Sequence, residues 1–107
     1  MSKVYSYLGL ARRAGQVVSG EQAVSGAIKR GQVFLVLIAS DASSNTHRKF
    51  SALAQYHDVC CFVYGKKDRL GHAIGQSPRA VLGVLDRNFA GVIQTHLGES
   101  VQQYNEE

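Results

Sequence analysis

Hydrophobic residues recur every three or four positions in five stretches of the chain, and this spacing predicts amphipathic helices. Residues that cap helix N-termini, such as serine and asparagine, and glycines that end helices mark most of the boundaries. The expected helices run from Ser2 to Gly15, from Ser19 to Gly31, from Ser43, Ser44 or Asn45 to His57, from Leu70 to Ile74, and from Asp86 or Asn88 to Gly98.

Short apolar segments between these helices predict strands. Val33–Ala39 holds seven apolar residues without alternation, which is typical of a strand covered on both faces. Val59–Tyr64 and Ala80–Leu85 predict two more strands, and Val17-Val18 predicts a brief fourth. Because strands alternate with helices in the middle of the chain, crossovers and mostly parallel neighbours are expected. The pattern therefore predicts the α/β class, as a three-layer α/β/α sandwich around about four short strands.

Length and composition favour one folded domain. The 107 residues suit a single domain, and a hydrophobic content of 45% argues against disorder. We expect this domain over residues 1–98 and a polar, acidic tail over residues 99–107. No run is long enough for a membrane span and no signal peptide is evident, so a cytoplasmic protein is expected. Cys60 and Cys61, which accompany no metal-binding pattern, are expected to be reduced packing residues.

Positive charge is concentrated in the first half of the chain. Residues 1–53 contain seven Lys or Arg residues against two acidic ones, whereas residues 54–107 contain five against six. A basic half is typical of proteins that bind a polyanion, most often nucleic acid. An inert basic surface would have the same composition, so charge alone leaves both interpretations open.

Familiar catalytic motifs are absent from the sequence. Gly15 and Gly20 have the spacing of a phosphate-binding loop, but Glu21 stands where that motif requires lysine. A GxGxxG fingerprint is missing, and the four histidines form neither an i, i+4 ligand pair nor a recognisable nucleophile arrangement. We therefore expect no enzymatic activity, no cofactor and no metal site.

The start of the second expected helix is a candidate anion-binding site. The first turn of a helix presents unpaired backbone N–H groups and partial positive charge, which attract phosphates. Gly20 lets a phosphate or a base approach without a Cβ in the way. Gln22 can bond a base edge, while Ser25, Lys29 and Arg30 lie farther along and can contact a polyanion backbone.

The same residues also have a plain structural interpretation. Ser19 followed three positions later by Gln22 is a capping-box pattern, and Gly20 then only forms the turn. In this interpretation Lys29 and Arg30 are solvated side chains.

A second candidate is the segment Gly75-Gln-Ser-Pro-Arg79, which precedes the last expected strand. It combines polar donors, an arginine and a rigid proline. If all strands point the same way, this loop lies at the wrong end of the sheet for a site shared with Gly20. One antiparallel pairing would bring the two together.

Six short motifs form a combination that is more specific than any one of them alone. They are Leu8-Gly-Leu-Ala-Arg-Arg-Ala-Gly15, Ser19-Gly-Glu-Gln-Ala-Val24, Gly31, Val36-Leu-Ile-Ala-Ser-Asp41, Asn45-Thr46 and Leu70-Gly-His-Ala-Ile-Gly75. In this combination the chain resembles the kink-turn RNA-binding ribosomal proteins, which include archaeal large-subunit protein "seven-Ae" and eukaryotic "thirty-e". It is most similar to their small bacterial relatives of the YlxQ type, over roughly residues 4–97.

The resemblance implies an α/β/α sandwich with a mixed sheet. It also implies an RNA site built from the N-terminus of the second helix, the loop after the Val33–Ala39 strand and the loop before the last strand. Combined with the basic residues, it gives a set of candidate RNA-binding residues: Gly20, Glu21, Gln22, Ser25, Lys29, Arg30, Ser43, Arg48, Gln76, Ser77 and Arg79.

The chain departs from the family pattern Gly-x-Asn-Glu-x-x-Lys at three positions. Gln22 replaces the asparagine, Ala23 replaces the glutamate that is expected to read guanine, and Gly26 replaces a phosphate-binding lysine. The family's Arg-Pro order is also reversed, to Pro78-Arg79. Base-edge contacts carry specificity and phosphate contacts carry position and affinity, so these changes favour recognition of RNA shape and backbone.

Two function hypotheses remain at this point. The first is a non-catalytic RNA-binding protein of ribosomal-protein type, monomeric when free, which docks a structured RNA that is kink-turn-like or ribosomal. The ribosome and ribosome-associated proteins would be its further partners. The alternative is a protein-interaction module that kept the fold but lost specific RNA binding.

Overall fold

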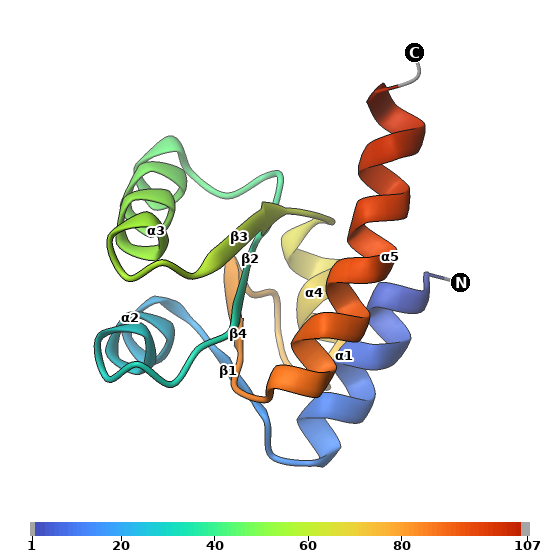
Figure 1. Cartoon of the computed structure of the whole chain (residues 1–107), viewed down its shortest axis with the longest axis horizontal. Helices are drawn as coiled ribbons and strands as arrows, with labels where there is room; N and C mark the ends of the chain where they lie inside the picture. Colours follow the sequence, from blue (N-terminus) through green and yellow to red (C-terminus); the bar gives the residue numbers. More distant parts are fainter. Residues whose placement is uncertain (1, 106–107) are drawn as a thin grey trace.

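The computed structural model describes the backbone of residues 2–105 and the side chains of residues 2–98, with five helices and four strands in this part (Figure 1). The elements in chain order are α1 (Lys3–Arg13), β1 (Val17–Ser19), α2 (Glu21–Lys29), β2 (Leu35–Ile38), α3 (Ser44–Tyr56), β3 (Cys60–Val63), α4 (Lys67–Ala73), β4 (Val81–Val84) and α5 (Arg87–Asn105). No helix among the described residues is long and apolar enough to cross a membrane.

The four strands form one mixed sheet in the order β1-β4-β2-β3. β2 and β3 are parallel, whereas β4 runs antiparallel to both of its neighbours, β1 and β2. The mixed sheet implied by the family resemblance is therefore confirmed, and the expectation of mostly parallel neighbours is wrong. The physical reason is that residues 74–80 fold back along α4, where Gln76 N donates to Gly71 O, so β4 starts where β2 and β3 end.

Helices cover both faces of this sheet, which confirms the three-layer α/β/α sandwich. Figure 1 shows α2 and α3 on one side of the strands, and α1, α4 and α5 on the other. Along β2, Leu35 and Leu37 pack toward the α1 side, while Val36 and Ile38 pack toward α2 and α3. All four side chains are fully buried, which explains why this strand shows no polar alternation.

Three of the expected helix caps are found, and one is wrong. Ser2 caps α1, Ser43 caps α3, and Asp86 accepts from the Phe89 N–H at the start of α5. The N-cap of α2 is Gly20 rather than Ser19, because Ser19 still pairs with Leu82 as the last residue of β1.

The C-terminal boundary also differs from the sequence-based expectation. Gly98 does not end α5, which continues to Asn105, because a single glycine inside a helix lowers its stability without preventing it. The expected acidic tail over residues 99–107 thus begins within this helix, and residues 106–107 lie outside the described residues.

The two cysteines lie side by side in the edge strand β3. Cys61 packs partly against the core between the sheet and α3, and this burial raises the pKa of its thiol. Cys60 is exposed, so the expectation that it is a packing residue is wrong. Successive side chains of a strand point to opposite faces, so Cys61 faces α3 whereas Cys60 lies on the other face, at the edge of the sheet.

Candidate nucleic-acid interface

Four connecting segments meet at one end of the sheet. β1, β2 and β3 finish there and β4 begins there, as shown by the pairing of Ile38 with both Val63 and Val81. The Gly20 N–H closes the group by donating to the Val81 carbonyl over 3.1 Å. We call this surface the loop end; it comprises residues 20–23, 40–43, 65–67 and 76–80.

Gly20 begins α2 in a conformation that other residues rarely adopt. Its φ of 91° and ψ of 156° fall in a region populated essentially by glycine alone. No side chain caps the helix, and a Cβ built on Gly20 would meet nothing within 4 Å. The N–H groups of the first turn of α2 therefore have no side-chain cap, the space beside Gly20 is open, and the positive end of the helix dipole lies at this turn.

Ser19 does not cap α2 because its hydroxyl has another partner. Arg79 donates from Nε to Ser19 Oγ over 3.0 Å. The same guanidinium donates to Ser77 Oγ over 2.7 Å and to Gln76 Oε1 over 3.2 Å, and further to the Ser77 and Pro78 carbonyls. Arg79 therefore fastens the loop before β4 to the end of β1.

Glu21 connects the start of α2 to the start of α3. Its carboxylate accepts from the Thr46 hydroxyl over 2.9 Å, and Thr46 in turn accepts from the Ser43 hydroxyl over 3.0 Å. Lys49 lies 3.9 Å from the other carboxylate oxygen of Glu21, in an exposed ion pair. The Thr46 hydroxyl thus links Glu21 and Ser43 in one chain of hydrogen bonds.

The remaining segments of the loop end are tied together by backbone groups. The Lys67 N–H donates to Asp41 Oδ1 over 2.9 Å, and the Lys67 carbonyl accepts from the Arg79 N–H over 3.0 Å. Ser40 donates to the Gly65 carbonyl over 2.7 Å. These bonds join all three loops that flank the Gly20 turn, so the surface has a defined shape without a ligand.

Seven of the eleven candidate residues are brought together at the loop end. They are Gly20, Glu21, Gln22, Ser43, Gln76, Ser77 and Arg79. This placement follows from the antiparallel β4, which was the condition for the two candidate loops to meet.

The other four candidates lie along the helices. Ser25 and Lys29 line a hollow of about 370 Å³ between α2 and α3. Lys29 is about 12 Å along the axis from the first residue of α2. Arg30 follows as the C-cap of α2, and Arg48 is exposed on α3.

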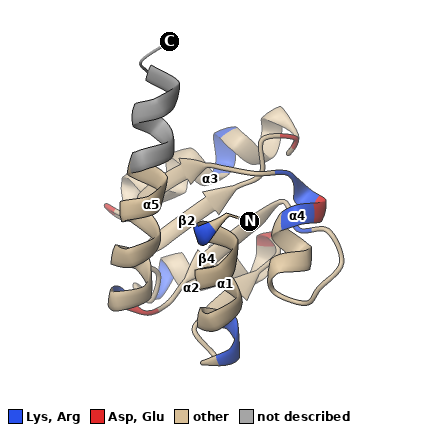
Figure 2. Cartoon of the chain, turned by 90° about the vertical axis from the view of Figure 1, so that its right-hand side faces the viewer, with Lys and Arg blue, Asp and Glu red and all other residues tan. Residues whose placement is uncertain are grey.

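Several residues within or next to the loop end were not predicted from the sequence. Thr46 donates a hydrogen bond to Glu21, and Lys49 forms an ion pair with it. The adjacent basic residues Arg48 and Lys49 were the feature of the sequence that could have indicated Lys49. Lys66 and Lys67 were not among the predicted site residues, although Lys66 precedes α4 and Lys67 is its first residue at this end. Figure 2 shows the resulting group of basic residues at the start of α4.

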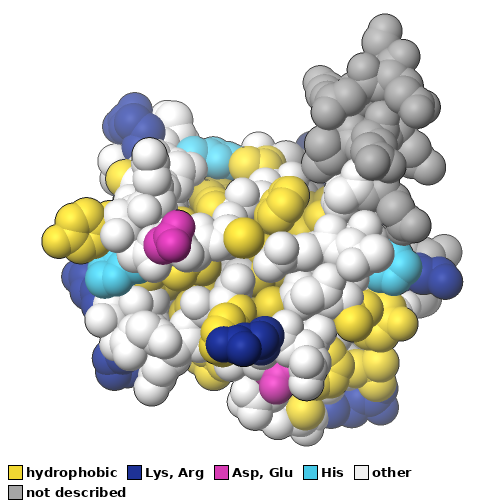
Figure 3. Space-filling model, viewed as in Figure 1, with side chains coloured by type: hydrophobic (Ala, Val, Ile, Leu, Met, Phe, Trp, Pro, Cys, Tyr) yellow, Lys and Arg dark blue, Asp and Glu magenta, His cyan; other side chains and the backbone are white. Residues whose placement is uncertain are grey.

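The surface as a whole suits an anion better than a metal ion. Among the described residues no group of three His, Cys, Asp or Glu side chains could hold a metal. Acidic side chains are sparse in the view of Figure 3, where Lys and Arg lie around the edge of the molecule and also near the middle of the visible face. Open helix N–H groups with basic neighbours are chemically suited to phosphate.

Residues 2–93 match the model of the Ribosomal protein L7Ae/L30e/S12e/Gadd45 family. The RNA-binding protein YlxQ of Bacillus subtilis (strain 168) is 41% identical over 86 residues, which are 80% of this chain and 86% of that protein. The RNA-binding protein YlxQ of Enterococcus faecium is 35% identical over 88 residues, 82% of this chain and 84% of that protein.

Two solved structures share the fold. A protein with unknown function from Bacillus halodurans C superposes with a TM-score of 0.89 at 37% identity, covering 92% of this chain and 99% of that one. The Giardia lamblia 15.5kD RNA binding protein superposes with a TM-score of 0.75 at 20% identity, covering 90% and 82% of the two chains. The chain therefore belongs to the L7Ae/L30e/S12e/Gadd45 family of ribosomal proteins, as a bacterial member of the YlxQ type.

Proposed function

We propose that this protein binds structured RNA by docking its bent backbone on the loop end. The observation that carries the proposal is the uncapped start of α2 behind Gly20, with open space in front of it. A phosphate placed there accepts hydrogen bonds from first-turn N–H groups that have no side-chain partner. The names of the two YlxQ relatives, both RNA-binding proteins, agree with this assignment.

The side chains of the loop end divide into groups that position it and groups that remain available. Arg79, Ser77 and Gln76 hold each other, so their main task is to fix the loop. Gln22 is exposed in the first turn of α2 and has no hydrogen-bond partner among the described residues, so its amide can bond a base edge or a sugar hydroxyl. Recognition in this arrangement reads the shape and backbone of the RNA, without a carboxylate at position 23 to select guanine.

Arg30 compensates for the family lysine that is replaced by Gly26. A Cβ built on Gly26 would lie 3.1 Å from Nη1 of Arg30, so the guanidinium lies over the glycine. Side chains on a helix lean toward its N-terminus, and residues four apart share a face. The missing side chain at position 26 thus leaves room for a positive charge one turn closer to the loop end than the Arg30 backbone.

The proposal is tested by a gel-shift assay with a kink-turn RNA, an unkinked duplex of equal length and ribosomal RNA, at two salt concentrations. We expect the kink-turn and ribosomal RNAs to bind more tightly than the duplex, with affinity that falls as salt rises. Gln22→Ala should weaken binding several-fold, whereas the matched control Gln55→Ala, on an exposed position of α3, should not. Equal affinity for all three RNAs, or equal behaviour of the two variants, contradicts this site.

A protein-interaction module remains the second candidate, and one observation favours it. Tyr56 is 83% exposed beside the α2–α3 hollow, which Lys29 and Lys49 flank. Exposed aromatic residues are common in protein interfaces. Purification of the tagged protein with and without nuclease separates the candidates, because RNA-bridged partners are lost after nuclease treatment and direct protein partners persist.

A further inference from the structure

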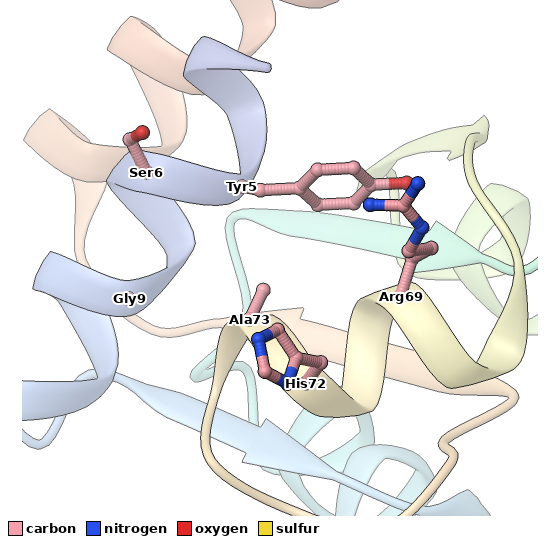
Figure 4. Close-up of a pocket in the computed structure, with 6 residues that line it drawn as sticks. All are labelled: Tyr5, Ser6, Gly9, Arg69, His72 and Ala73. Atoms are coloured by element: carbon pink, nitrogen blue, oxygen red, sulfur yellow. The ribbon is translucent and has the colours of Figure 1, made fainter. Parts of the chain in front are cut away.

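Two adjoining hollows lie between α1 and α4, on the face of the sheet opposite to α2. The first is a cavity of about 250 Å³ lined by Tyr5, Ser6, Gly9, Arg69, His72 and Ala73 (Figure 4). A second hollow of about 310 Å³ shares Gly9 and Ala73 with the first and extends to Arg12, Arg13 and Gly75. We call the two together the α1–α4 groove.

Basic side chains stand at both ends of this groove. Arg69 lies at one end, and Arg12 and Arg13 lie at the other. None of the three pairs with a carboxylate among residues 2–98, where the ion pair found is that of Lys49 with Glu21. Asp68 is the acidic residue whose charge reaches the Tyr5 end. Figure 2 shows the blue residues of α1 and α4 on this face of the molecule.

Tyr5 gives the groove a fixed aromatic wall. Its ring lies 5.5 Å from the ring of Tyr64, whose hydroxyl shares a hydrogen bond of 2.6 Å with Ser2. Gly65 leaves the space that the Tyr5 hydroxyl occupies. Figure 4 shows the guanidinium of Arg69 at the hydroxyl end of this ring. A tyrosine hydroxyl is protonated at neutral pH, and burial raises the pKa of Tyr5 further.

This combination matches the chemistry of single-stranded nucleic acid. Such strands bind in positively charged grooves that follow the backbone, with bases against aromatic side chains. Arg12 is seven residues from Tyr5, which places them about 10 Å apart along α1, a span that several nucleotides cover. A cavity slightly below the range of about 300–1,000 Å³ for small-molecule pockets suits one base or sugar.

The groove also begins beside the loop end. Arg69 is in the first turn of α4, two residues after Lys67, whose backbone bonds to Asp41 and Arg79. We propose that the α1–α4 groove binds a single-stranded extension of the RNA that docks at the loop end, with phosphates at the arginines and a base against Tyr5. The inference rests on the proposed RNA-binding function. It adds a second binding site to that function and specifies single-stranded RNA as its ligand.

The first test measures RNA affinity for a kink-turn hairpin with and without a single-stranded oligouridine tail. The tail should tighten binding to the unaltered protein about fivefold at low salt, because extra phosphate contacts release extra counterions. Arg12→Gln and Arg69→Gln should each remove most of this gain and leave affinity for the tailless hairpin unchanged. Arg87→Gln, which removes an exposed charge outside the groove, is the matched control and should keep the gain.

Photochemical crosslinking tests whether single-stranded RNA binds in the α1–α4 groove, independently of hairpin binding at the loop end. Oligouridine carrying 5-iodouridine should attach to Tyr5 or His72, as identified by mass spectrometry. If the tailless hairpin fails to bind, the proposed function of the loop end fails, while the crosslink still reports on the groove. Attachment elsewhere or none at all overturns the inference. Competition by a polyglutamate peptide as strong as that by RNA also overturns it, because the groove is then a site for acidic protein.

Discussion

Gly20 is the residue on which the shape of the loop end most directly depends. Its backbone conformation, and not a lack of space, is what requires glycine, because nothing lies near a Cβ at this position. An alanine here must either adopt a strained conformation, at a cost of about 1–3 kcal/mol, or change the path from β1 into α2.

We therefore expect Gly20→Ala to lower the free energy of unfolding by about 1–3 kcal/mol and to weaken RNA binding. Denaturant unfolding and anisotropy titration measure the two effects. Gly91→Ala is the control, since Gly91 lies on the exposed side of α5 with open space around it. That change should raise stability by up to about 1 kcal/mol. An equal response of the two variants would contradict the conformational argument.

Arg79 raises the question of whether charge or shape matters at one side chain. Its guanidinium reaches Ser19, Ser77 and Gln76 at the same time, and a lysine ammonium cannot span these acceptors. We expect Arg79→Lys to lose as much RNA affinity as Arg79→Ala, roughly tenfold, even though it keeps the charge. Titration of both variants measures this.

The control for this comparison is Arg48→Lys. Arg48 is exposed and makes no hydrogen bond or ion pair within the described part of the chain, so its replacement by lysine should change nothing. If Arg79→Lys instead binds like the unaltered protein, Arg79 acts on phosphate through its charge alone.

At the scale of the element, one face of α2 lacks the family's lysine side chain and carries an arginine side chain in its place. Gly26 lacks the side chain of the family lysine, and the guanidinium of Arg30 lies over it. We expect Arg30→Ala to weaken RNA binding about threefold alone, and by less in a Gly26→Lys background, because the new lysine supplies the charge. A double-mutant cycle in RNA affinity measures this coupling. Strictly additive effects would show that the two positions act separately.

The sequence predicted the elements of this fold better than their directions. The continuous apolar run Val33–Ala39 correctly predicted a doubly covered strand, because burial on two faces leaves its mark on every residue of β2. The direction of β4 depends instead on Gly71, where a Cβ would lie 2.7 Å from the carbonyl carbon of Ser77. This tertiary contact, which lets the chain fold back along α4, has no periodic signature in the sequence.

The candidate site shows the same division. Loop residues such as Gln22 and Ser43 were recognisable by type and position, since capping and turn chemistry is local. The bond between Arg79 and Ser19 joins residues 60 positions apart and changes the interpretation of both. Ser19 does not cap α2, and Arg79 holds the loop before β4 in place by hydrogen bonds. Local sequence patterns were thus enough to predict the candidate surface. The hydrogen bonds between its residues could be identified only from the structure.

At the scale of the whole molecule, charge and contact geometry act on different steps of binding. The basic residues are spread over several elements of the first half of the chain, whereas the open N–H groups are confined to one turn. Distributed charge raises the rate of encounter with RNA, and local contacts determine how long the complex lasts.

Arg48→Gln should therefore lower the association rate constant about twofold at low salt and leave the dissociation rate unchanged, because Arg48 has no bonds within the described residues and contributes only to the field. Gln22→Ala should do the reverse and raise the dissociation rate. Stopped-flow measurements at two salt concentrations distinguish the cases, since the effect of Arg48 fades as salt screens it. A salt-independent loss for Arg48→Gln would mean that this arginine contacts the RNA directly.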